Sequence, residues 1–419
     1  MVCTRKIVVL AAMVGLVTLS CVPFASADVG YSMRGDTRPF HNWDSAFNLS
    51  ASENDDNGTD GVVWDSDSFT FRPHVGMSVG YDDNVYLKPD NEIDDTYWSV
   101  APGIMLIYGQ EDDDYLSLNY EYEITKYTDE DVLDYDSHLL SAGVRLTPGL
   151  LDVHLSDQYT DSIDVNPETA KRTAREQNSE MLTISRFVSK KTTVVAEQRY
   201  DINNYKDDLY LDYDELWFGG WLYHRTFPKV STFVGAGYGI VNMTDAGVWG
   251  DSDYFDCAFG AQGRVTAKTT VHARLGWEDR EFEDDIDSIQ DWTCLIGVSS
   301  RFSNRTYWGV DVSRSLNPSS SRAGYTRIPT VIMPSIRHIL WKDSLSVSVS
   351  GAYELADYYG HHGEAQRDDK YWYITGVLDW HPQNLLTVGA GFTHAEQTSD
   401  IDEDEYSDNR MFFRAMLNY

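Results

Sequence analysis

From residue 68 to the end of the chain, apolar side chains recur at every second position, in stretches separated by polar breaks. In one such stretch, the even positions from Leu116 to Ile124 are apolar, and the odd positions from Ser117 to Glu123 are polar. Successive side chains of a β-strand point to opposite faces of the sheet. The pattern therefore predicts strands with one apolar and one polar face.

Counting the alternating stretches predicts an all-β chain of about eighteen strands, with 16–20 as the range of counts that the pattern allows. The predicted strands lie near 68–81, 95–109, 113–127, 134–147, 150–161, 177–189, 191–205, 210–226, 228–242, 252–266, 268–282, 288–302, 305–316, 322–339, 342–357, 368–381, 384–397 and 407–419.

The breaks between these stretches alternate between short and long. Short breaks include Pro148-Gly149 and Ser303-Asn304, whereas long acidic breaks include YDDNVYLKPDNEIDD, TDSIDVNPETAKRTAREQ and QTSDIDEDEYSD. Short turns on one rim and long loops on the other are typical of outer-membrane barrels. An even number of strands also places both ends of the barrel on the short-turn rim.

A soluble sandwich would alternate as well, but it would not need an apolar stripe on every strand. Aromatic residues near the strand ends favour a membrane, where such residues form belts at both interfaces. The residues assigned to these belts are Trp98, Tyr120, Trp217, Trp221, Trp277, Trp292, Trp308, Trp372 and Trp380. Only a closed barrel of strands satisfies every backbone polar group in lipid. We therefore expect a transmembrane antiparallel up-and-down β-barrel.

The last nine residues, MFFRAMLNY, form an alternating stripe that ends on an aromatic residue. This stripe predicts the closing strand of the barrel. Its end resembles the C-terminal signal by which bacterial outer-membrane barrels are recognised for assembly. The residues assigned to that signal are Phe413, Leu417 and Tyr419.

The N-terminus has the pattern of a secretory signal peptide. Arg5 and Lys6 precede an apolar run that is followed by Ala25-Ser26-Ala27, which predicts cleavage after Ala27. A retained anchor and a lipoprotein site at Cys21 are the alternatives. The chain then divides into a signal peptide (1–27), a polar linker or plug (28–67) and the barrel (68–419). No later segment has the apolar length of a membrane-spanning helix.

Charge and cysteine content narrow the function further. The chain carries 33 basic and 67 acidic side chains, a formal net charge of −34, so we expect no binding to nucleic acid. Two cysteines remain after the signal, Cys257 and Cys294, and the predicted strands place both on apolar faces two strands apart. We therefore expect them not to form a disulfide.

Residues 71–108 carry a more specific resemblance. The core Gly80-Tyr81-Asp82-Asp83-Asn84-Val85-Tyr86, followed by an acidic stretch and Ser99-Val100-Ala101-Pro102-Gly103, resembles the first hairpin of a family of bacterial outer-membrane β-barrel porins. The resemblance implies an outer-membrane barrel of a kind often associated with export of exopolysaccharide. It implies no catalytic residues and no cofactor.

The polar faces of the predicted strands supply candidate pore-lining residues. These are Glu121, Glu123, Arg145, Glu197, Arg199, Asp256, Arg264, Arg274, Glu278, Arg280, Asp311, Arg327, Glu354, Asp379, Arg410 and Arg414. Rings of one charge sign select ions, but this set is mixed. Arg264, Arg274 and Arg280 are candidates for a basic ladder opposite acidic residues. The alternative is that the charges pair across neighbouring strands.

Other chemistry finds little support in the sequence. Residues 56–67 match a calcium loop only in part, and the pair His361-His362 is better explained as a solvated loop than as a metal site. No spaced nucleophile, base and acid were found, so we expect neither an enzyme nor a metal.

The sequence therefore predicts a porin-like channel in the bacterial outer membrane for passive passage of small hydrophilic solutes. A polysaccharide-export barrel and a structural or adhesin-like barrel with a closed lumen remain as alternatives. The expected partners are outer-membrane lipid and lipopolysaccharide, the barrel-assembly machinery, and the solute or polysaccharide itself. The oligomeric state and the occupancy of the lumen by residues 28–67 stay open.

Overall fold

The structure is a computed structural model that describes residues 64–66, 68–109, 114–166, 168–244, 250–282, 288–322, 324–341, 344–360, 365–383 and 385–418. The predicted signal peptide, nearly all of the calcium-like loop, the His361-His362 pair and Tyr419 lie outside these residues. Of the predicted linker, the structure describes Trp64–Ser66 (β1), whose backbone pairs with β2.

The described residues form one sheet of 20 strands, of which β1 and Asn317–Pro318 (β15) are short additions, leaving 18 in the ring. The ring strands are β2 (Phe69–Asp82), β3 (Asp95–Gly109), β4 (Tyr115–Tyr127), β5 (Tyr135–Leu146), β6 (Leu151–Val165), β7 (Arg172–Phe187), β8 (Thr192–Tyr205), β9 (Tyr213–Phe227), β10 (Val230–Met243), β11 (Ser252–Arg264), β12 (Thr269–Phe282), β13 (Ile289–Ser303), β14 (Thr306–Arg314), β16 (Thr326–Trp341), β17 (Leu345–Tyr359), β18 (Ala365–Gln383), β19 (Leu386–Ser399) and β20 (Tyr406–Asn418).

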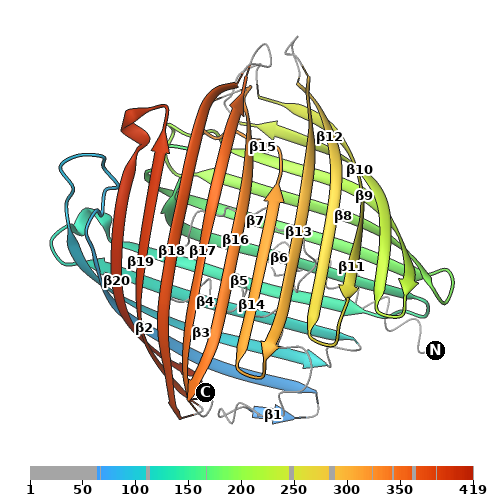
Figure 1. Cartoon of the computed structure of the whole chain (residues 1–419), viewed down its shortest axis with the longest axis horizontal. Coiled ribbons are helices and arrows are strands. Elements are labelled where there is room, and N and C mark those ends of the chain that lie inside the picture. The colour runs from blue at the N-terminus through green and yellow to red at the C-terminus, as the bar shows by residue number, and fades with distance from the viewer. Residues whose placement is uncertain are drawn as a thin grey trace.

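Every ring strand pairs antiparallel with its neighbours in the chain, and β20 pairs with β2 to close the ring. The closing register places Val75 opposite Leu417 and Val79 opposite Phe413. Figure 1 shows the tilted strands following one another around the barrel. The expected fold is confirmed, and so is the placement of both barrel ends on the rim of the short turns, such as 228–229 and 304–305.

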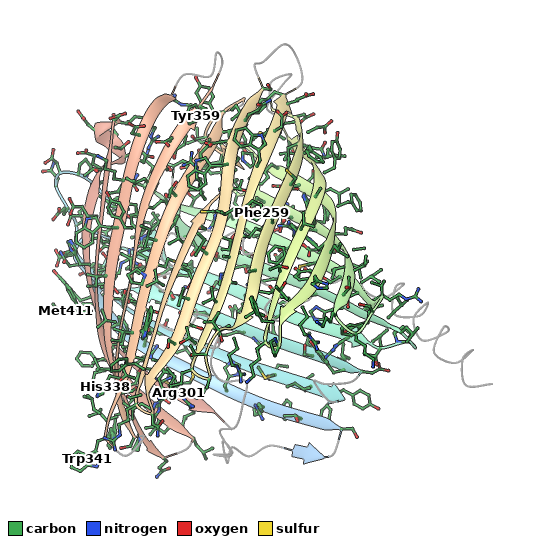
Figure 2. All side chains as sticks on the ribbon, turned by 45° about the vertical axis from the view of Figure 1, so that its right-hand side comes forward. Phe259, Arg301, His338, Trp341, Tyr359 and Met411 are labelled. Carbon is green, nitrogen blue, oxygen red and sulfur yellow. The ribbon has the colours of Figure 1, made fainter. Side chains whose placement is uncertain are left out.

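The outer face of the barrel is largely apolar. Met77 is 53 % exposed, Phe259 62 % and Phe413 66 %, although each lies in the middle of a strand. Figure 2 shows Phe259 between Trp341 at one end and Tyr359 at the other. No helix in the described part of the chain is long and apolar enough to cross a membrane. A closed ring with such an outer face is stable where lipid, not water, surrounds it.

Two of the aromatic residues assigned to the interfacial belts were placed wrongly. Trp217 is 2 % exposed and Trp221 5 %, whereas Trp277 is 47 % and Trp380 52 % exposed. The two buried residues belong to the inner face of β9, because they share alternate positions opposite the exposed Phe218 and Leu222. Counting from the apolar side chains alone cannot separate an aromatic residue that faces lipid from one that packs inside.

Two long-rim connections also differ from the expected ones. The predicted loop after residue 161 is shorter than expected, because β6 and β7 continue to Val165 and from Arg172. The connection 315–325, which contains β15, is longer than the predicted break at 317–321. Both connections prove central to the interior of the barrel.

Cys257 is exposed and Cys294 is buried, and both are free, as expected. They lie on β11 and β13, with β12 between them.

Candidate functional site: the inner wall and its mouth

The inner face of the barrel is identified by side chains that meet across an intervening strand, because side chains converge on the concave side of a curved sheet. Arg414 on β20 binds Asp379 on β18 at 2.8 Å, past β19. His74 on β2 meets Glu121 on β4 at 3.2 Å, past β3. The candidate pore-lining residues therefore share a face with groups that point inward.

A glycine on the intervening strand makes these contacts possible. A Cβ at Gly389 would lie 2.4 Å from Oδ1 of Asp379 and 3.0 Å from Nε of Arg414. The same arrangement recurs at Gly103 under the His74–Glu121 contact and at Gly297 under His272 and Asp311. Any larger residue at these positions would occupy the space in which the two polar groups meet.

Most of the candidate pore-lining charges are found in ion pairs, some between strands and some along a single strand. Arg145 pairs with Asp152 at 2.8 Å, and Arg199 pairs with Glu197 at 3.2 Å. Arg327 pairs with Glu354, and Arg410 pairs with both Asp82 (3.1 Å) and Asp408 (2.5 Å). Glu123 is 2 % exposed, and Arg264 lies at the short-turn end of β11.

The three arginines of the predicted ladder share the inner face, and Arg274 and Arg280 are matched by carboxylates. Arg274 binds Asp256 at 3.1 Å, and Arg280 binds Glu278 at 3.0 Å and also donates to the carbonyl oxygen of Leu316. The inner wall is therefore a surface of alternating positive and negative groups rather than a row of bare cations.

Beneath these arginines lies an aromatic layer on β9 to β11. Trp217, Trp221 and Tyr254 are all buried on the inner face. The guanidinium groups lie over their rings, with the Cζ atom of Arg199 4.2 Å from the ring centre of Trp217. Arg274 and Arg280 lie over Trp221 and Tyr254 in the same way, both at 4.6 Å. Cations over aromatic faces are stabilised by the ring quadrupole.

Trp217 fixes this layer by a hydrogen bond across β10. Its Nε1–H donates to Oδ1 of Asp256 at 2.6 Å, and the indole lies flat over Gly237. The sequence carries a signal for this arrangement. Glycines recur at alternate positions on β10, including Gly235 and Gly239, and Gly219 lies on β9, each beneath one of these rings.

At the long-loop rim, the segment 83–94 between β2 and β3 packs against the inner wall. Asn84 and Val85 are fully buried. Arg172, at the start of β7, donates to the carbonyl oxygen of Val85 at 2.9 Å and binds Asp82 at 2.7 Å. Strands β3 to β6 separate β2 from β7 in the ring, so this contact reaches across the mouth.

A second contact joins nearly opposite walls. Glu168, in the segment 166–171, accepts hydrogen bonds from the backbone N–H groups of Ser320 and Ser321 and from the hydroxyl of Ser319, at 2.8–3.0 Å. The serines belong to the segment 315–325. Strands β8 to β13 separate the two segments on one side of the ring, and β17 to β20 with β2 to β5 on the other. Glu168 is 3 % exposed.

The segments 83–94, 166–171 and 315–325 are called the mouth segments below. Leu87, Asn91 and Ala170 have positive φ angles of 53–54°, and they are the non-glycine residues with positive φ among all described residues. All three lie in mouth segments. Such backbone costs about 1–3 kcal/mol per residue and persists where surrounding contacts impose it. Leu87 and Ala170 are held in one apolar cluster with Tyr406.

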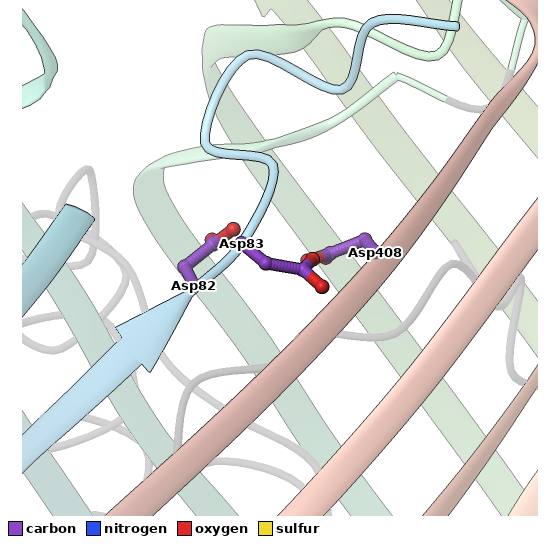
Figure 3. A group of neighbouring side chains, drawn as sticks. All are labelled: Asp82, Asp83 and Asp408. Carbon is purple, nitrogen blue, oxygen red and sulfur yellow. The ribbon is translucent and has the colours of Figure 1, made fainter. Parts of the chain in front are cut away.

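Three carboxylates meet beside the segment 83–94. Oxygen atoms of Asp82, Asp83 and Asp408 lie within 4.8 Å of one another (Figure 3). The guanidinium groups of Arg172 and Arg410 bind Asp82, and Asp83 accepts hydrogen bonds from the backbone and side chain of Asn409. The two arginines offset most of the negative charge, so this cluster is an ion-pair network rather than a metal site.

The predicted assembly signal is placed in part. Phe413 points outward and is 66 % exposed, and Leu417 pairs with Leu386 and Val75 at the short-turn rim. Its role in assembly stays a prediction.

Comparison with known proteins yields a likeness of fold. No protein-family model and no curated protein matches the chain. Among solved structures, Pseudomonas aeruginosa OccK3 (OpdO) is similar with 14 % identity over 83 % of this chain and 96 % of that chain, at a TM-score of 0.45. Acinetobacter baumannii OccAB4 is similar with 9 % identity over 83 % and 98 %, at 0.45. The outer membrane protein OpdK from Pseudomonas aeruginosa is similar with 11 % identity over 83 % and 99 %, at 0.45.

Proposed function

We propose that the chain is a channel of the bacterial outer membrane through which small hydrophilic solutes pass passively, with its passage narrowed by the mouth segments. The observation that carries the proposal is the division of the ring into an apolar outer face and an ion-paired inner face. Barrels of this strand number enclose an aqueous interior. No step of this function requires catalysis.

The inner wall supports polar solutes rather than one type of ion. Its arginines and carboxylates alternate, so neither cations nor anions meet a continuous field of one sign. A hydrated solute exchanges hydrogen bonds with such a wall as it moves. The aromatic layer under Arg199 and Arg274 adds a stiff backing that keeps these groups in place.

The location follows from the same division. Lipid of the outer membrane and lipopolysaccharide would surround the apolar face, and the long acidic loops would face the exterior. Export through the signal peptide and insertion by the barrel-assembly machinery belong to the proposal, as does the assembly role of Phe413, Leu417 and Tyr419.

The Glu168 contact bears on the two alternatives. A polysaccharide would need a continuous passage past the mouth segments. Export of exopolysaccharide, which the resemblance of residues 71–108 implies, would therefore require the hydrogen bonds of Glu168 to break. A structural barrel with a closed lumen is favoured by the same contact, because it joins nearly opposite walls.

Planar-bilayer recording with the refolded mature chain tests the proposal. We expect small unit openings, reversal potentials that show weak selectivity, and swelling of liposomes in small sugars and amino acids. Chain insertion is monitored separately, by protection of the barrel from protease. An inserted barrel with no openings and no solute flux would support the closed structural barrel instead.

A further inference from the structure

The apolar outer face of the barrel is interrupted on three consecutive strands, β6, β7 and β8. The register pairs Asp157 with Glu180 and Glu180 with Tyr200. These residues share a face with Leu155, Leu182 and Ala196, and the opposite face of the same strands holds the inward Asp201 and Arg199. Asp157 and Glu180 are therefore on the outer side, although Asp157 is only 4 % exposed among its neighbours and Glu180 is the more accessible of the two.

This outer polar face continues toward the long-loop rim. Tyr159 pairs with Asn178, and Asp161 pairs with Glu176. At the edge of this face nearest the long-loop rim, Lys206 binds Asp161 at 2.6 Å and Glu176 at 3.7 Å. We call this surface the polar face, and it consists of Asp157, Tyr159, Asp161, Glu176, Asn178, Glu180, Gln198 and Tyr200.

The height of the polar face conflicts with a lipid environment. On β6 the outer residues are apolar from Leu151 to Leu155, ~14 Å along the strand at ~3.4 Å per residue, and the next aliphatic outer residue, Ile163, follows only beyond Asp157, Tyr159 and Asp161. On β17 the apolar outer residues extend from Leu345 to Leu355, ~34 Å along the strand by the same rise, as a tilted strand needs to cross an apolar band of ~25 Å.

The exposed large hydrophobic residues show the same difference between β6 to β8 and the rest of the barrel. On β6, β7 and β8 the exposed large hydrophobic residues are Leu151, Ile184, Phe187 and Val194, all close to the short turns. On β16, by contrast, they run from Ile332 through Ile336 to Trp341. A carboxylate at the height of Glu180 is unfavourable against acyl chains.

We propose that the polar face is covered by a second copy of this chain, so that the barrel works as a homo-oligomer with β6 to β8 at its interface. The composition of the face supports a copy over other partners. Its more accessible groups include the hydrogen-bond donors Tyr159, Asn178 and Tyr200 and the acceptors Glu176 and Glu180, so donors of one copy can meet acceptors of another. Identical chains in a membrane associate about an axis along the membrane normal, and such contacts close.

The inference rests only on the barrel lying in a bilayer and does not depend on the channel being open. The test measures the mass of the full mature chain in mild detergent and in lipid nanodiscs, by native mass spectrometry or light scattering. The wild-type chain is expected as a dimer or trimer. A chain that stays monomeric in nanodiscs at every concentration would overturn the proposal and indicate a locally thinned bilayer.

The deciding variant makes the polar face apolar, Asp157→Val with Glu180→Leu. The chain offers a matched control, because Asp253 and Glu281 are also a directly opposed outward Asp–Glu pair, at the long-loop rim of β11 and β12. We expect Asp157→Val/Glu180→Leu to shift the population to monomer by at least tenfold, and Asp253→Val/Glu281→Leu to leave it unchanged.

Circular dichroism and resistance to unfolding in detergent show that the variant barrel is intact. Unit conductance per barrel separates this inference from the proposed function. Monomers of unchanged conductance support both proposals, whereas absence of conductance in every chain contradicts only the channel. An oligomer that persists in the Asp157→Val/Glu180→Leu variant would show that another surface holds the copies together.

Discussion

Asp379 and Arg414 bind one another across β19 because Gly389 leaves the space between them empty. The two residues belong to β18 and β20, which do not pair, so the contact ties three strands beside the seam where β20 meets β2. The glycine thus acts through the interaction that it permits and not through its own contacts.

The Gly389→Ala variant is expected to separate this pair. Two buried charges would lose their partner, and bonds to charged groups contribute about 1.5–3 kcal/mol each, so we expect the free energy of unfolding to fall by about 2 kcal/mol. Urea unfolding in detergent micelles measures it. Gly376→Ala on β18 is the control, because a Cβ there meets nothing within 4 Å. Equal losses in both variants would contradict the explanation.

Trp217→Phe is expected to remove one hydrogen bond while keeping an aromatic ring over Gly237. Asp256 would retain Arg274 but lose the 2.6 Å bond from the indole. We expect a loss of about 1.5–3 kcal/mol in the free energy of unfolding. Trp98→Phe, at an outward position that is 48 % exposed, serves as the control and should cost less. A larger loss at Trp98 would place the important indole on the outer face.

Glu168→Gln is expected to weaken the contact between the mouth segments. A carboxylate can accept all three hydrogen bonds from Ser319, Ser320 and Ser321, whereas an amide nitrogen only donates. We expect mean conductance and liposome swelling rates to rise several-fold. Glu92→Gln, an exposed position in the segment 83–94, is the matched control. Unchanged flux in Glu168→Gln would mean that the contact does not limit passage.

Arginine on the outer face should cost free energy according to its height. Phe259 lies in the middle of β11, and Trp341 lies at the end of the barrel (Figure 2). We expect Phe259→Arg to be about 2–4 kcal/mol less stable than Phe259→Ala, and Trp341→Arg to differ from Trp341→Ala by about 0–1 kcal/mol. Unfolding in liposomes provides the values. A reversed order would place the apolar band elsewhere.

Tyr86 provides a prediction about pH at the mouth. Its hydroxyl donates to Glu130 at 2.6 Å, and this bond raises the pKa of Tyr86 from 10.0 to about 12. The neutral phenol is the favoured form, so the contact stabilises the folded chain below pH 10 and is lost as the pH rises toward 12. The difference in absorbance titration between wild-type and Tyr86→Phe chains isolates this group. A midpoint near 10 would contradict the bond.

The strands could be predicted from the sequence because the two faces of a barrel strand meet different surroundings. Lipid on one side and polar groups on the other impose the alternation directly, and the range 95–109 coincides with β3. The mouth segments could not be predicted in this way. Loops carry no periodicity, and the contact of Glu168 with Ser320 joins residues that only the closure of the ring brings together.

For individual inner residues, the sequence predicted that the side chain faces the interior of the barrel but not which residue it contacts. Arg274 and Asp256 were both assigned to the polar face, yet their pairing depends on the register of β11 and β12. Trp217 was misplaced because its size suggested the lipid interface, whereas Gly237 beneath its ring makes room inside.

The seam between β2 and β20 determines when this molecule can be finished. The first and last strands of the barrel must pair, and they are separated by nearly the whole length of the polypeptide. Until the last strand has been synthesised, the two edge strands of the incomplete sheet carry backbone N–H and C=O groups without partners. Such groups are unfavourable in the hydrocarbon of a membrane. The unfinished chain must therefore be kept out of the bilayer, and loss of even the last dozen residues should leave an export intermediate and no shortened product.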